Sequence, residues 1–160
     1  PASACLMAGF NALTIADALA ARYASGTLTP PSGYSAVRVS TARLPNAIPL
    51  SPWVLVMPPS GEVVISSSQE VTLDYRVLFH YAKNTGDVAR DMVGMLSWLG
   101  ILLTATFGQT SLGLSATQYV KSALPGAFRF TVETYGGDEY YGWEITVTVI
   151  LRDLGWTFTA

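Results

Sequence analysis

The chain has 160 residues, of which 50% are hydrophobic, and its 9 basic and 11 acidic residues give a net charge of −2. This length and apolar content suffice for the core of one domain and exclude intrinsic disorder. With no basic excess to displace counterions, a protein that coats nucleic acid is also excluded. A single cysteine, Cys5, and a single histidine, His80, exclude an internal disulfide and leave no basis for a cysteine-based metal site.

The charged fraction of 12% is about half of that in a typical soluble domain. It fits either a secreted protein rich in small residues or a subunit whose surface is largely covered by partners. Residues 1–10 contain no Lys or Arg before their apolar stretch, so they do not predict a signal peptide. Residues 92–120 carry no charge, but glycines interrupt them. We therefore expect a buried helix there and no membrane partner.

The first third of the chain predicts one helix and several short strands. Apolar periodicity favours a helix over residues 8–24 with Gly26 as its stop signal, followed by a short strand over 36–41. Prolines in residues 44–52 exclude helix and central strand and favour an extended arm. Residues 53–57 and 62–66 are predicted to form a hairpin through the Pro-Pro-Ser-Gly segment 58–61.

The middle of the chain gives the clearest pattern. Residues 71–81 alternate between apolar and mostly polar side chains, which predicts a strand covered on one face. A second helix is expected to start with Thr85 as its N-cap and to run to about Phe107. Gly94, Ser97 and Thr104 form a small-residue face that would let the first helix approach. The predicted core stripe of this second helix consists of Val88, Met92, Met95, Leu96, Leu99, Leu102 and Leu103.

The last third predicts three strands, over residues 117–124, 127–135 and 140–153, with breaks at Pro125-Gly126 and Gly136-Gly137. No repeat or linker interrupts the chain. The sequence therefore predicts a single α+β domain over residues 1–160, with two main helices on one face of a largely antiparallel or mixed sheet.

Catalytic chemistry finds little support. His80 lies on the polar face of a strand, and no Gly-x-Ser-x-Gly motif accompanies it, so an exposed or interface histidine is expected. Asp138 and Glu139 lie in a glycine turn, which favours a solvated hairpin tip over an acid–base pair. No phosphate-binding or zinc-binding motif occurs. The tyrosines and tryptophan around residues 135–143 lack interleaved basic residues, which favours packing or a protein interface over base stacking.

The layout from about residue 8 to 153 resembles that of a phage protein family. A long alternating strand ends in Phe79-His80-Tyr81, Thr85-Gly86-Asp87 leads into a long apolar helix, and an aromatic strand over residues 141–151 closes the chain. This order, after an N-terminal helix and a Pro-rich arm, is similar to that of the tail terminator (tail completion) proteins of long-tailed bacteriophages. The resemblance is one of layout and carries no catalytic motif.

The resemblance implies a structural virion protein, assembled in the host cytoplasm, that forms a homo-oligomeric ring, typically a hexamer. The ring would cap the head-proximal end of the tail tube, contact the tube and neck or head-completion proteins, and let DNA pass through its lumen. It implies no enzyme activity, cofactor, metal, membrane or small-molecule substrate. Head-to-tail contacts close such a ring. The subunit-interface candidates are Pro45, Pro49, Pro52, Trp53, Pro58, Pro59, Asp74, Arg76, Glu144 and Arg152.

Two alternatives stay open. One is another ring component of the virion, such as a neck or tail-tube subunit. The other belongs to a different class, a small hydrolase or ligand-binding domain with a pocket near His80 and Tyr140.

Overall fold

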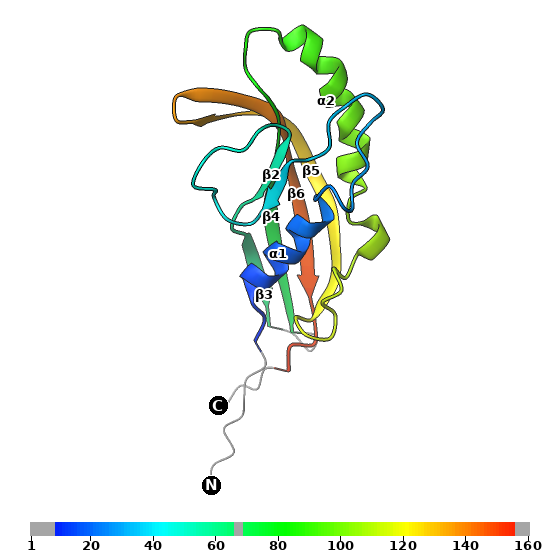
Figure 1. The fold of residues 1–160 in the computed structure, drawn as a ribbon. Helices are drawn as coiled ribbons and strands as arrows, with labels where there is room; N and C mark the ends of the chain where they lie inside the picture. The colour runs from blue at the N-terminus through cyan, green and yellow to red at the C-terminus, as the bar shows by residue number, and fades with distance from the viewer. Residues whose placement is uncertain (1–8, 66–68, 156–160) are drawn as a thin grey trace.

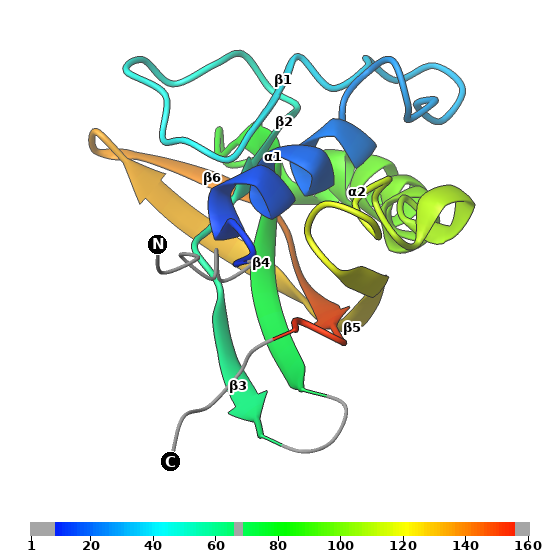
Figure 2. The same cartoon turned by 90° about the horizontal axis from the view of Figure 1, so that it is seen from below.

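The computed structural model describes residues 9–65 and 69–155, so Cys5, Ala8 and Ser66, which figure in the predictions above, lie outside the described residues. Two helices lie on one face of a six-stranded mixed sheet, in a single α+β domain (Figures 1 and 2). The elements are α1 (Ala12–Arg22), β1 (Val39–Thr41), β2 (Trp53–Val56), β3 (Ser60–Val64), β4 (Glu70–Lys83), α2 (Val88–Leu103), the 3-10 turn η1 (Phe107–Gln109), β5 (Val120–Tyr135) and β6 (Asp138–Leu151).

The strand order is β1-β2-β4-β6-β5, and β3 lies beside β4. The hairpin predicted between β2 and β3 is wrong, because both strands pair antiparallel with β4. They follow one another along a single edge of β4, and Pro58 and Pro59 separate them. Proline has no N–H to give to a ladder, so it interrupts the edge strand there instead of forming a tip.

The C-terminal third forms two strands where three were predicted. Pro125 and Gly126 lie inside β5, at a register shift between Pro125 and Phe128 in its pairing with β6. A proline is tolerated there because β5 is an edge strand with a bulge. The predicted break at Gly136-Gly137 is confirmed as the β5–β6 turn. Both glycines have positive φ, 61° and 88°, as a two-residue hairpin turn with the right twist requires.

Helix α1 is shorter than predicted. Asn11 caps it by accepting hydrogen bonds from the N–H groups of Leu13 and Thr14, and it ends at Arg22, before Gly26. Leu13 is apolar but 47% exposed. The residues that pack against the sheet are Ile15, Ala16, Leu19 and Ala20. Strand β1 is also shorter than predicted, with Val37 buried and Val39 exposed.

Helix α2 buries only part of the predicted stripe: Met95 and Leu102 are in the core, and Leu99 and Leu103 pack against it. Its N-cap is Asp87, which accepts from the Arg90 N–H, and not Thr85. Three residues of the predicted core stripe, Val88, Met92 and Leu96, are exposed. Gly94 faces the rings of Tyr34 and Tyr81 rather than α1. The buried residues of α2 are Asp91, Gly94, Met95, Trp98 and Leu102.

Segment Val88–Gln109, which contains α2, is long and apolar enough to cross a membrane by length and composition alone. A core helix of a globular protein meets the same criterion. In this structure α2 lies against the sheet, where Trp98 is fully buried beside Phe79 of β4, with their ring centroids 5.1 Å apart.

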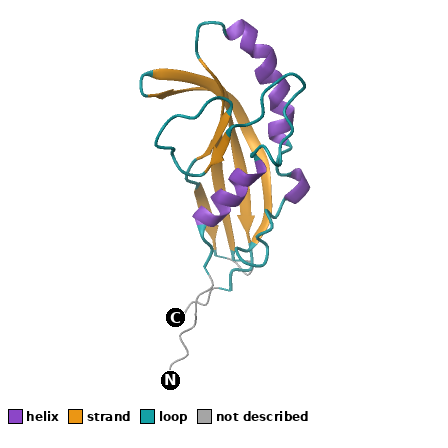
Figure 3. Ribbon diagram, viewed as in Figure 1, coloured by secondary structure: helices purple, strands orange, loops and turns teal. Residues whose placement is uncertain are grey.

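The main core lies between the helices and the sheet. The side chains of β4 that were predicted to be apolar and covered point into it: Tyr75, Val77 and Phe79 are buried, and so are Ile145 and Val147 of β6. A second, smaller core lies on the face of the sheet away from the helices, around Trp53, Leu55 and Leu78. Long loops before and after β1 complete the cover of the β2 side (Figure 3).

Candidate functional site

The second core encloses residues that the sequence had placed at a surface. Trp53 is fully buried and stacks on His80, with ring centroids 3.9 Å apart and planes 12° apart. The His80 Nε2 lies 3.0 Å from the Tyr135 hydroxyl, at the tip of the β5–β6 hairpin. Pro52 is buried as well. The interface roles predicted for Pro52 and Trp53 are therefore wrong, because neither offers surface to a neighbour.

The expectation of an exposed or interface histidine is also wrong, since His80 is 1% exposed. Desolvation by burial lowers the pKa of His80 to about 4. The imidazole is therefore neutral at pH 7 and serves as a packing group. Burial raises the pKa of its partner Tyr135 to about 12. Within residues 9–65 and 69–155, no group of three or more His, Cys, Asp or Glu side chains could hold a metal.

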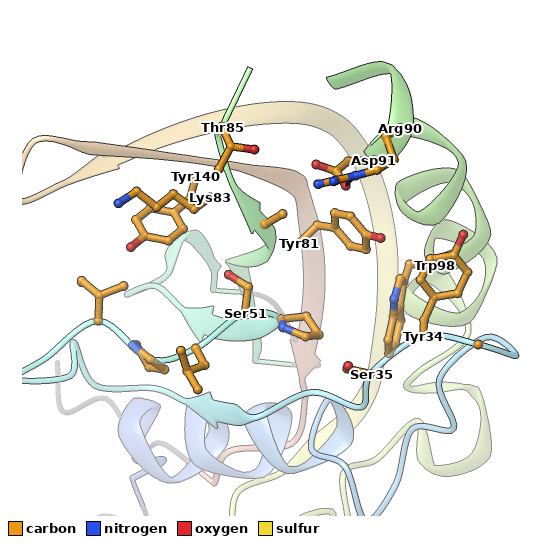
Figure 4. Close-up of a pocket in the computed structure, with 16 residues that line it drawn as sticks. Tyr34, Ser35, Ser51, Tyr81, Lys83, Thr85, Arg90, Asp91, Trp98 and Tyr140 are labelled. Carbon is orange, nitrogen blue, oxygen red and sulfur yellow. Dashed lines mark hydrogen bonds and ion pairs between the residues drawn. The ribbon is translucent and has the colours of Figure 1, made fainter. Parts of the chain in front are cut away.

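An open cavity of about 560 Å³ lies between the arm, the end of β4 and the start of α2. Figure 4 shows Tyr34, Tyr81 and Trp98 at the α2 end, with Lys83 and Tyr140 across from them. Its charged groups are already paired. Lys83 binds Asp138 at 2.8 Å, and Arg90 binds Asp91 at 3.3 Å. His80 does not line this cavity, so the predicted pocket near His80 and Tyr140 contains only the tyrosine.

Asp91 anchors the start of α2 to the sheet. The buried Tyr141 hydroxyl donates a hydrogen bond to this carboxylate, and burial is the first cause that raises the pKa of Tyr141 to about 12. The Trp143 indole N–H donates to the Met95 carbonyl at 2.9 Å. Tyr141 and Trp143 therefore fix α2 over β6, while Tyr135 and Tyr140 lie beside His80. The predicted aromatic cluster is split between two faces.

The polar interface candidates on the sheet find partners within the chain. Glu144 accepts from Arg76 at 2.7 Å and from Arg129 at 3.1 Å. The hydrogen bond from Arg76 is the first cause that lowers the pKa of Glu144. Asp74 accepts from the Thr148 hydroxyl at 2.7 Å.

At the far end of the sheet, Arg152 binds Glu70 at 2.7 Å. These contacts hold adjacent strands together. Whether a neighbouring subunit also uses these residues stays a prediction.

A surface that the sequence did not predict lies beside α2. Phe130 pairs directly with Trp143, so its side chain points to the helix face of the sheet, beyond the strand that α2 covers. Met92 and Leu96 flank Met95 on α2, on the side away from Gly94 and its β4 neighbour Tyr81. We call this region the α2–β5 surface. Its members, each between 41% and 56% exposed, are Val88, Met92, Leu96, Phe128, Phe130 and Val132.

A second apolar feature lies on the same face, at the opposite lateral edge of the sheet. A cavity of about 210 Å³ between α1 and the end of β2 is lined by apolar side chains alone. Two interface candidates, Pro58 and Pro59, form one wall, and Leu13 of α1 forms another. We call it the α1 socket. Its remaining lining residues are Ala12, Ala16, Ala42, Val56 and Met57.

Strands β5 and β3 each leave a free edge. Among the described residues, β5 pairs only with β6 and β3 pairs only with β4. The side chains of Val63, Val64 and Ile65, in and just after β3, are 54%, 42% and 71% exposed. Free strand edges next to exposed apolar side chains are typical of surfaces that another chain covers.

Comparison with protein-family models finds no family that matches the chain, and comparison with curated proteins finds no match either.

Proposed function

We propose that this protein is a structural subunit that assembles with copies of itself into a closed ring. Following the resemblance of its layout, the ring caps the head-proximal end of a phage tail tube, stops its growth and joins the tail to the neck. The function is then geometric, and no side chain needs to carry out chemistry.

The α2–β5 surface carries this proposal. Its six side chains are about half exposed, which leaves on the order of 500 Å² of apolar surface uncovered. Such a patch is at the upper end of what a monomer exposes, and a specific interface of standard size buries about 800 Å² from each partner. The chain has a second apolar region at the opposite edge, around β3 and the α1 socket. Two different surfaces on one chain suit the head-to-tail contacts of a ring.

The mass of the native assembly tests the proposal. Light scattering and electron microscopy of the purified protein should give one closed ring of fixed subunit number. A monomer at high concentration would contradict it. Filaments would instead favour the alternative of a tube subunit, because tube subunits stack without a stop.

The cavity beside the arm supports a second candidate function, a small ligand-binding domain. Its volume of about 560 Å³ lies within the range of small-molecule sites. In this case the protein would be a monomer with an occupied cavity, and Tyr81→Ala would weaken ligand binding. The hydrolase form of this alternative loses its base, because His80 is enclosed between Trp53 and Tyr135.

A further inference from the structure

The α1 socket has the size and chemistry to hold one aromatic ring. Apolar side chains line its volume of about 210 Å³, and an apolar cavity of about 150 Å³ suffices for benzene. Leu13 at its wall is 47% exposed, so the socket opens at the surface. Aromatic anchors that fill such pockets supply most of the binding energy in many interfaces.

Two phenylalanines at the opposite lateral edge of the sheet, in β5, are available as anchors. Phe128 and Phe130 are 47% and 50% exposed. Both point to the same face, because Phe128 pairs with Ile145 and Phe130 with Trp143. The strand order places β5 at one lateral edge and β2 with β3 on the other side of β4. One subunit therefore cannot fill its own socket with these rings, whereas the next copy can.

We infer that the α1 socket of one subunit receives a phenylalanine of β5, Phe128 or Phe130, from the next subunit. This inference rests on the proposed ring and names its subunit contact. A second copy is the favoured occupant because the chain carries both halves of the contact, each beside a free strand edge. The α2–β5 surface supplies roughly 500 Å² from one copy, and Leu13 with the exposed β3 side chains supplies several hundred Å² from the other, so the total over both copies approaches roughly 1,000 Å², the lower limit for a specific interface.

The contact is heterologous, so two complementary variants test it. Leu13→Glu blocks the socket and leaves the phenylalanines intact. Phe128→Glu combined with Phe130→Glu removes the anchors and leaves the socket intact. Each variant alone should be a monomer by light scattering. An equimolar mixture should form a dimer of twice the monomer mass and nothing larger, because one functional socket and one functional anchor meet only once.

Phe107→Glu is the matched control. Phe107 is 58% exposed on η1 and belongs to neither surface, so this variant should keep the ring. Circular dichroism of each variant reports its fold. If a glutamate variant does not fold, Leu13→Ser and Phe130→Ser replace the pair and should raise the concentration at which the ring dissociates at least tenfold.

The outcomes separate the two proposals. If the wild-type protein forms a ring and both variants still form it, the socket contact is wrong, but the proposed ring function is not contradicted. Variants that stay monomeric after mixing overturn the heterologous pairing. A monomeric wild-type protein overturns the ring function itself.

Discussion

The two sides of the sheet are finished differently. On the β2 side, the arm and the hairpin tip close over Trp53 and His80, so that side chains on the face away from the main core are buried as well. On the β5 side, α2 stops over β6, and Phe128 and Phe130 on the helix face stay half exposed. The loops thus cover the outer face at the β2 edge, whereas the helix face at the β5 edge stays partly exposed. The closed part of the β2 side stabilises the fold, whereas the proposed ring would use the exposed side chains of the β5 side together with those around β3 and the α1 socket.

Matched aromatic truncations should show the largest difference between the two sides. Trp53→Ala removes a fully buried ring and should lower the free energy of unfolding by about 3–5 kcal/mol. Phe130→Ala should lower it by less than about 1 kcal/mol, because half of its surface is already in water. Urea denaturation in the Leu13→Glu background separates folding from assembly. Equal losses for the two variants would contradict the comparison.

A pH titration should isolate His80 on the closed side. Burial lowers its pKa from 6.5 to about 4, so the unfolded chain takes up this proton first as the pH falls. The contribution of the neutral His80 to the free energy of unfolding is therefore complete above pH 6.5. As the pH falls from 6.5 to about 4, the free energy of unfolding decreases by up to about 3 kcal/mol because of this group. His80→Gln should remove this part of the pH dependence while the carboxylates still titrate. A wild-type profile that matches the variant would show that His80 is not desolvated.

Glu144 lies in β6, on the face of the sheet away from the helices. Glu144→Gln should lower the free energy of unfolding by only about 1 kcal/mol, because its two arginine partners are largely exposed and solvent screens their charges. The pKa of Glu144 is lowered, so its contribution is present above its ordinary pKa and is lost as the pH falls through the folded value. The difference in unfolding free energy between wild type and variant should therefore shrink in acid. A constant difference would contradict the ion-pair explanation.

The smallest effect is expected from the ion pair between Arg43 and Asp17. Both side chains are mostly in solvent, 62% and 43% exposed, so Arg43→Ala should change the free energy of unfolding by less than about 0.5 kcal/mol. Thermal unfolding at low and high salt checks this. A loss above 1 kcal/mol would mean that the start of the arm is held more firmly than its exposure indicates.

Burial was predicted best in the strands, where the alternation of apolar and polar residues within one strand shows which side chains point to the core. The alternation in β4 places Tyr75, Val77 and Phe79 in the main core as predicted, but the expectation of a single covered face is wrong at the end of β4, where Leu78 and His80 on the other face are buried as well. Helix α2 was harder because apolar residues occur on several of its faces. Its buried face is set by partners distant in sequence, as in the contacts of Asp91 with Tyr141 and of Met95 with Trp143.

Other errors came from reading prolines as ends of elements. Pro58 and Pro125 each lie at an edge of the sheet, where an interruption or a bulge absorbs the missing N–H. The α1 socket could not be predicted, because it joins α1 to residues about 45 positions later in the chain. The α2–β5 surface did leave a signal in the sequence, because the apolar residues Phe128, Phe130 and Val132 alternate with the polar residues Arg129 and Thr131.

The long central strand also constrains when the chain can fold. Tyr75 in β4 pairs with Val147 in β6, so one edge of β4 stays unpaired until β6, about 70 residues later in the chain, has left the ribosome. Contacts this distant in sequence make folding slow and expose apolar strands meanwhile. A nascent chain that ends before β6 would lack a partner for one edge of β4, so chaperone binding during synthesis should be strongest just before β6 emerges.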